Sequence, residues 1–123
     1  MKKLFILPAL LMLLSCYERE RNCTDFKIGK FKFEHEIDGV KRTTLFERQQ
    51  NIEIENFEGD VDTSTVRWIN DCEYILQKIN PKNMQEKKAV HMKILSTKEK
   101  SYTFEFSIVG DPNKQKGTVT KID

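Results

Sequence analysis

Apolar and polar side chains alternate with a period of two residues along most of this sequence, and this pattern restricts the chain to a β-rich fold. The clearest case has Tyr102, Phe104, Phe106 and Ile108 alternating with polar residues, as expected where successive side chains of a strand face opposite ways. Residues 16–123 also contain 25 Val, Ile and Thr but only one Ala and three Leu. That ratio favours strands over helices.

Turn signals divide the pattern into short strands. Asp38-Gly39 accepts the positive φ of a type I′ hairpin, whose register sets Phe31 opposite Phe46 and Glu36 opposite Lys41. Eight strands are expected, near residues 26–37, 40–49, 51–57, 62–69, 72–79, 89–97, 101–109 and 115–122. Closure removes the free edges of such a meander, so we predict an all-β fold in which an antiparallel eight-stranded meander closes into a small barrel, as a single domain over residues 25–123.

Two segments interrupt the strand pattern. The alternation changes phase at Gly29-Lys30, where a bulge or a sharp bend is expected. Asn80-Pro81, followed by Lys82 to Lys88, favours a short helix with the Asn as its cap and the Pro in its first turn.

Bulky side chains dominate the face that we expect to point into the barrel. An eight-stranded barrel has room for its own side chains or for one small ligand. We therefore predict a largely filled interior, with any ligand confined to a mouth near Trp68, Arg42 and Tyr102. The expected inward residues are Phe31, Phe33, Phe46, Ile54, Trp68, Tyr102, Phe104 and Phe106.

The N-terminus has the features of an export signal. Lys2 and Lys3 precede an apolar run of eleven residues, 4–14, which is too short to span a bilayer. The following Leu13-Leu14-Ser15-Cys16 resembles the lipobox of bacterial lipoproteins. This resemblance implies a signal peptide over residues 1–15, lipid attachment at Cys16 and a charged tether over 16–24. The alternative is an ordinary cleaved signal with an incidental cysteine.

A lipid anchor implies a membrane partner and a place in the bacterial cell envelope. Tyr17 follows Cys16, in place of the Asp that retains many such lipoproteins at the inner membrane, so we expect the outer membrane, on its periplasmic or surface face. Without residues 1–15 the chain has 19 basic and 19 acidic side chains. This balance opposes a nucleic-acid partner, which would require a surplus of positive charge.

Cys23 and Cys72 remain once Cys16 is assigned to lipid. An even pair in an exported chain favours a disulfide, here closing a loop of about 50 residues. The alternatives are a reduced pair or a metal site shared with His35. No zinc-type spacing of cysteines and histidines is present, so we expect neither a metal nor another cofactor.

Catalytic motifs are also absent from the sequence. Neither His35 nor His91 accompanies a nucleophile motif such as GxSxG, and no Gly-rich phosphate loop is found. Glu53 and Glu55 share a strand face and are interpreted as solvated acids, because no apolar pocket is evident to perturb them. We therefore expect no enzyme activity.

Three segments, residues 23–31 (CTDFKIGKF), 67–74 (RWINDCEY) and 117–121 (GTVTK), resemble a group of short bacterial lipoproteins of unknown function. Members of that group often carry the label DNA topoisomerase IV. That activity requires an ATP-binding domain, an acidic metal cluster and a tyrosine nucleophile spread over several hundred residues. The motifs of this chain do not support it.

Gly29-Lys30-Phe31 is also similar to the Gly-x-Trp of lipocalin-like barrels, with Phe in place of Trp. The resemblance implies that a cation of the last strand, Lys121, covers the Phe31 ring. Together these features favour a non-catalytic binding or structural barrel. The alternatives are a carrier of a small apolar ligand and an inhibitor that binds a secreted hydrolase.

Overall fold

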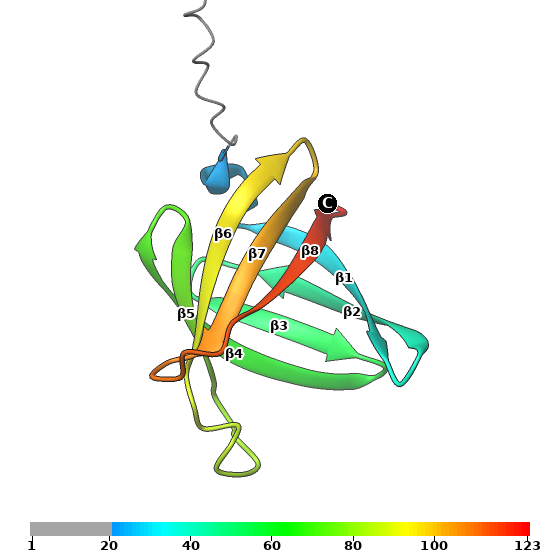
Figure 1. Cartoon of the computed structure of the whole chain (residues 1–123), viewed down its shortest axis with the longest axis vertical. Coiled ribbons are helices and arrows are strands. Elements are labelled where there is room, and N and C mark those ends of the chain that lie inside the picture. Colours follow the sequence, from blue (N-terminus) through cyan, green and yellow to red (C-terminus); the bar gives the residue numbers. More distant parts are fainter. Residues whose placement is uncertain (1–20) are drawn as a thin grey trace, which may run out of the picture.

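The computed structural model describes residues 21–123, which fold into a closed antiparallel barrel in which each strand pairs with its neighbours in sequence (Figure 1). The fold prediction is therefore confirmed. A 3-10 helix, η2 (Cys23–Phe26), precedes the strands β1 (Gly29–Ile37), β2 (Val40–Arg48), β3 (Ile52–Phe57), β4 (Asp60–Asn70), β5 (Glu73–Lys78), β6 (Val90–Lys98), β7 (Ser101–Ile108) and β8 (Gln115–Lys121). Within this part of the chain no helix is long and apolar enough to cross a membrane.

The first hairpin has the predicted register. Asp38 and Gly39 have φ of 53° and 77°, as a type I′ turn requires. Phe31 pairs with Phe46, and their rings stack with centroids 5.1 Å apart. The outer ion pair differs in detail, because the Lys41 ammonium lies 3.3 Å from Glu34 instead of contacting Glu36.

The first strand begins later than predicted, at Gly29 instead of residue 26. Residues 23–26 form η2, which buries the Phe26 side chain to 1% exposure. A bend follows, and Gly29 has a φ of 148°. A Cβ at Gly29 would lie 2.7 Å from Cε of Lys121, a flexible side chain that can move, so the positive φ is the stronger reason for glycine at this position. The expected bend therefore lies two residues earlier, at Lys27-Ile28, and the β1–β2 pairing runs without a bulge through Gly29 and Lys30.

The expected helix over residues 82–88 is wrong, because the segment forms turns. The side chain of Asn83 accepts a hydrogen bond from the Glu86 amide at 2.8 Å, and Glu86 Oε1 accepts one from the Lys82 amide at 2.9 Å. These local bonds compete with helix formation in a segment too short to nucleate a helix without tertiary support.

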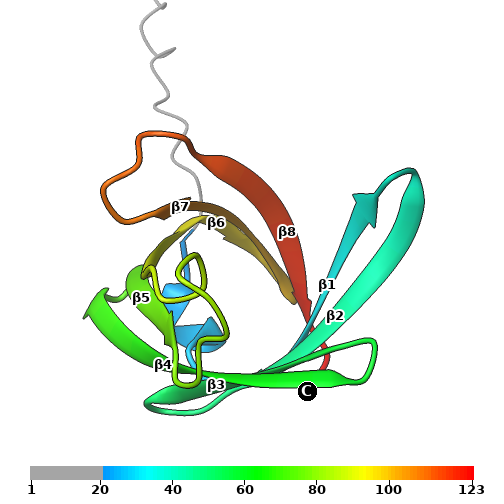
Figure 2. The same cartoon turned by 90° about the horizontal axis from the view of Figure 1, so that it is seen from below.

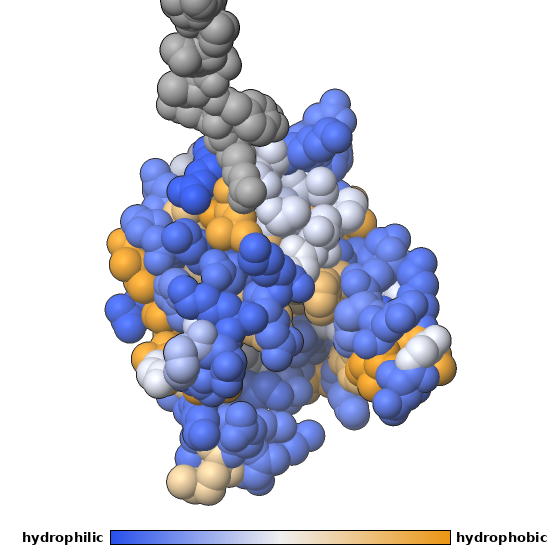
Figure 3. Space-filling model, in the orientation of Figure 1, coloured by the Kyte–Doolittle hydropathy of each residue, from blue (hydrophilic) through white to orange (hydrophobic). Residues whose placement is uncertain are grey.

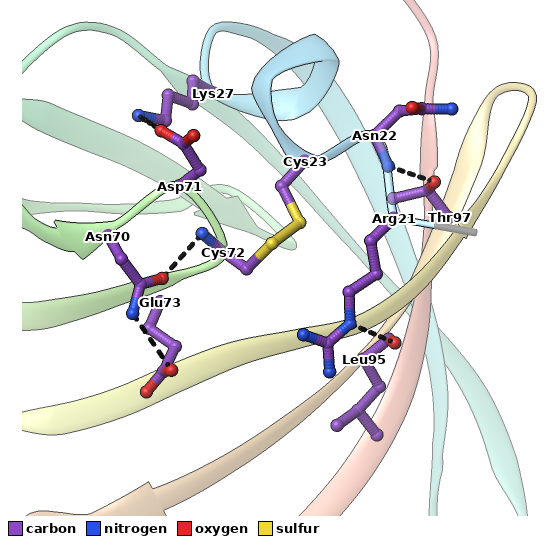
Figure 4. The surroundings of a disulfide bond; sticks show 10 residues. All are labelled: Arg21, Asn22, Cys23, Lys27, Asn70, Asp71, Cys72, Glu73, Leu95 and Thr97. Carbon is purple, nitrogen blue, oxygen red and sulfur yellow. Dashed lines mark hydrogen bonds and ion pairs between the residues drawn. A yellow bond between two sulfur atoms is a disulfide. The ribbon is translucent and has the colours of Figure 1, made fainter. Parts of the chain in front are cut away.

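A disulfide joins Cys23 of η2 to Cys72 in the turn between β4 and β5, which confirms the predicted pair (Figure 4). Lys27 and Asp71 form an ion pair beside it, with N and O 3.1 Å apart. The disulfide therefore holds η2 against one end of the barrel, which we call the closed end.

The opposite end, which we call the open end, is viewed directly in Figure 2. It contains the β1–β2, β3–β4, β5–β6 and β7–β8 connections. The seam between β1 and β8 is short, with only three residue pairs, from Phe31–Lys121 to Phe33–Val119. Beyond it the β1–β2 hairpin diverges from β8, and the surface is hollowed between them (Figure 3).

Candidate ligand site in the barrel interior

Arg48 is the most unusual interior residue, because its side chain is completely buried at the closed end of β2. The β1–β2 register turns it inward, in the same phase as Phe46. Its Nε donates to Glu53 Oε1 at 3.0 Å, and its Nη1 donates to the Phe26 carbonyl at 2.7 Å. Its Nη2 donates to the hydroxyls of Tyr74 and Tyr102 at 2.7 and 2.9 Å.

Aromatic rings complete the surroundings of this guanidinium. Its central carbon lies 4.7 Å from the Tyr74 ring centroid and 4.8 Å from that of Phe31. Burial alone lowers the pKa of Arg48, but its interactions with Tyr74, Tyr102 and Glu53 outweigh this effect, and the pKa is raised overall. Arg48 is therefore a permanent cation with four donated hydrogen bonds, in a role that stabilises structure.

The closed end of the interior is tightly filled around Arg48. Phe26, Phe31, Tyr74 and Tyr102 are each at most 2% exposed. The Phe26 and Tyr102 rings meet edge to face, with centroids 5.2 Å apart. Burial raises the pKa values of both tyrosines, so their hydroxyls stay neutral near pH 7. These buried side chains close the barrel interior at this end.

Toward the open end the interior contains a cavity of about 180 Å³. Several of its lining side chains are only half-buried, so solvent reaches it from the open end. The apolar lining consists of Phe33, Phe46, Leu76, Met92, Phe104, Phe106 and Val119. The polar lining consists of Thr44, Glu53, Glu55, Tyr74 and Tyr102.

The prediction of a filled interior is thus correct at the closed end and wrong near the open end. One reason is the polar content of β3, where Glu53 and Glu55 face inward. The β2–β3 register pairs Glu53 with Arg48 and Glu55 with Phe46, and it turns Ile54 outward. The inward assignment of Ile54 and the solvated assignment of the two glutamates are therefore wrong, because strand register decides the face of a side chain.

The two glutamates differ in their partners. Burial raises the pKa of Glu53, and Arg48 opposes this shift through an ion pair 3.0 Å long. Burial is the largest cause that raises the pKa of Glu55, and the negative charge of Glu53 raises it further. The positive charge of Lys78 opposes this shift. Glu55 makes no hydrogen bond or ion pair with the residues that the structure describes.

The three residues expected to form one ligand mouth do not come together. Trp68 and Tyr102 lie toward the closed end, where the Trp68 ring contacts Tyr74 with centroids 4.5 Å apart. Arg42 lies six residues before Arg48 on β2, about 20 Å away at the usual rise per residue. It donates to Glu58 at 2.6 Å. Cys16 lies outside the described residues.

The histidines occupy different faces. His35 points inward, stacks on Phe33 with centroids 4.8 Å apart, and has Nε2 3.3 Å from the Thr44 hydroxyl. His91 lies on the outer face, with Nε2 2.9 Å from Glu73. The cation over Phe31 is Arg48 and not Lys121, whose ammonium donates to the Asp25 carbonyl at 2.9 Å.

Within residues 21–123, no three metal-ligating side chains lie close enough to hold an ion. Comparison with protein-family models, with curated proteins and with solved structures finds no match to this chain. The fold and the site together define a small antiparallel barrel with a predominantly apolar cavity open at one end. The other end is closed by Arg48 and the residues bonded to it, Phe26, Glu53, Tyr74 and Tyr102, which we call the Arg48 layer.

Proposed function

We propose that this protein is a non-catalytic binding protein of the cell envelope that holds one small, mainly apolar ligand in its barrel. The cavity of about 180 Å³ is the observation that carries this proposal. Aromatic and aliphatic side chains form most of its lining, as is typical of small-molecule sites. The groups with possible catalytic chemistry, Arg48, Glu53 and the two tyrosines, instead bond to one another.

The volume restricts the size of this ligand. A dry engineered cavity of about 150 Å³ holds benzene, whereas sites for drug-sized molecules begin near about 300 Å³. A cavity of about 180 Å³ therefore fits one ring or a short branched chain. A long acyl chain would have to project through the open end.

Benzyl alcohol, a ring with one neutral polar group, is a suitable first probe. We expect it to bind with a dissociation constant near or below about 1 mM, equivalent to about −4 kcal/mol. Leu76→Trp should weaken binding at least about tenfold, because Leu76 lines the cavity and the larger ring would fill it. Titration followed by NMR or calorimetry measures both values.

Ile75→Trp is the matched control, because Ile75 neighbours Leu76 on β5 and contributes to a surface hollow outside the barrel. It should bind the probe like the parent protein, and both variants should retain the β-sheet circular dichroism spectrum. An equal loss of benzyl alcohol affinity in both variants would contradict a ligand site in the cavity, and so would a parent protein that does not bind the probe.

The anchoring part of the proposal is supported by the sequence around Cys16. From Cys16 to Arg21 the chain spans five residue steps, at most about 18 Å. Arg21 lies at the closed end, where its Nε donates to the Leu95 carbonyl at 3.1 Å. A lipid on Cys16 would therefore hold the closed end near the bilayer and direct the open end toward water, where a ligand can exchange.

Replacing Cys16 by Ser should abolish fatty-acid labelling and shift the protein from the membrane fraction to the soluble fraction. Such a shift is large because several acyl chains anchor a protein far more firmly than one. Metabolic labelling with a palmitate analogue and membrane fractionation test the expectation. An unlabelled wild-type protein, or a Cys16→Ser variant that keeps its label, would show that the cysteine is not the lipid site.

A further inference from the structure

The electrostatics of the cavity distinguish among possible ligands. The charged side chains of its walls are the carboxylates of Glu53 and Glu55, and Glu53 has Arg48 as its direct ion-pair partner. The walls with this partner therefore have a formal surplus of one negative charge. An anionic ligand finds no free cation there, because Arg48 already donates to four acceptors.

Arg48 and Lys78, the cations whose charges act on the two glutamates, are already paired with acids other than Glu55. Arg48 pairs with Glu53, and the Lys78 ammonium lies 3.3 Å from Asp62 and 3.5 Å from Glu86. Glu55 is thus left as a carboxylate at the cavity wall without a bonded partner among residues 21–123. A carboxylate that is partly removed from water is stabilised when a cation is brought next to it.

The surroundings of Glu55 also suit an organic cation. Phe46 is its direct neighbour across the β2–β3 ladder, at the short Cβ separation of opposed residues. Phe33, Phe104 and Phe106 contribute further rings to the same lining. Aromatic faces attract cations within about 6 Å, and such rings with a carboxylate form a familiar receptor for ammonium groups.

We propose that the cavity binds a small apolar amine, whose ring or chain contacts the phenylalanines and whose ammonium group pairs with Glu55. This inference depends on the proposed ligand-binding function and adds the chemical class of the ligand. An amine of about eight heavy atoms matches the size limit set by the cavity.

Three probes of one shape test the charge preference: benzylamine, benzyl alcohol and benzoate at pH 7.5. Benzylamine should bind roughly tenfold tighter than benzyl alcohol, the effect of one charge-assisted hydrogen bond. Benzoate should bind weakest. In Glu55→Gln the ratio of the benzylamine affinity to the benzyl alcohol affinity should fall to about one.

Glu47→Gln serves as the control. Glu47 pairs with outward-facing Ile54, so this substitution removes the same charge on the outside of the barrel. It should keep the full preference for benzylamine. Glu55→Met repeats the test with a second substitution that removes the carboxylate. Equal binding of benzylamine and benzyl alcohol by the parent protein, or a preference that survives in both Glu55 variants, overturns the amine inference alone. If none of the three probes binds, the proposed function itself fails.

Discussion

Replacing Arg48 by Met should reduce the free energy of unfolding by about 3–5 kcal/mol, the usual cost of removing one partner from a buried ion pair. The substitution leaves the Glu53 carboxylate, the Phe26 carbonyl and the hydroxyls of Tyr74 and Tyr102 without their donor. Domains of this size have only about 5–15 kcal/mol of stability. Urea or guanidinium unfolding should therefore show a large decrease in midpoint.

Arg42→Met is the matched control on the same face of the same strand. Arg42 pairs with Glu58 at the open end, where the two side chains are 37% and 45% exposed, and exposed pairs contribute about 0–1 kcal/mol. The double variant Arg48→Met with Glu53→Leu should recover part of the loss, since it removes the orphaned charge. An Arg48→Met variant no less stable than Arg42→Met would contradict the structural role of Arg48.

Much of the barrel follows from local sequence features. The alternation at Phe31 and Phe33 continues without interruption, and Asp38-Gly39 permits one kind of tight turn, so the β1–β2 register can be derived without a structure. The disulfide is likewise indicated by an even pair of cysteines in a chain with an export signal.

The Arg48 layer was not predicted, although the sequence contains a signal for it. Extending the alternation of β2 from Thr44 and Phe46 places Arg48 on the inner face. Continuing the pairing across the short β2–β3 connection places Glu53 beside it. The prediction for Ile54 relied on residue polarity alone, and polarity is misleading where a barrel buries an ion pair.

Other features depend on tertiary contacts that no local pattern contains. Phe26 continues an apparent strand in the sequence, but its burial against Tyr102 and the disulfide of Cys23 favour η2. The cavity depends on how far the rings of Phe33 and Phe104 reach across the interior. Both lie within 3 Å of a Cβ built at Gly117, so these rings pack toward β8 and leave space elsewhere.

Removing the disulfide should have an effect of similar size to that of Arg48→Met. Cys23 and Cys72 are 49 positions apart, and closing such a loop restricts the unfolded chain by about 4 kcal/mol in the chain-entropy model. The double substitution Cys23→Ser with Cys72→Ser should therefore lower the free energy of unfolding by about 2–5 kcal/mol. It should also lower the melting temperature by about 8–40 °C, at about 4–8 °C per kcal/mol.

The structure also predicts which residues lose stability first when the disulfide is removed. η2 is covalently held only through Cys23 and its continuation into β1, and it supplies the Phe26 carbonyl that accepts from Arg48. Amide hydrogen exchange should consequently accelerate in residues 23–28 before it does in β2 or β7. Wild-type protein under reducing conditions is the control and should unfold like the double variant, because both lack the same crosslink. Two free thiols in the isolated protein, or a stability loss below about 1 kcal/mol, would contradict the role of the disulfide in holding the closed end.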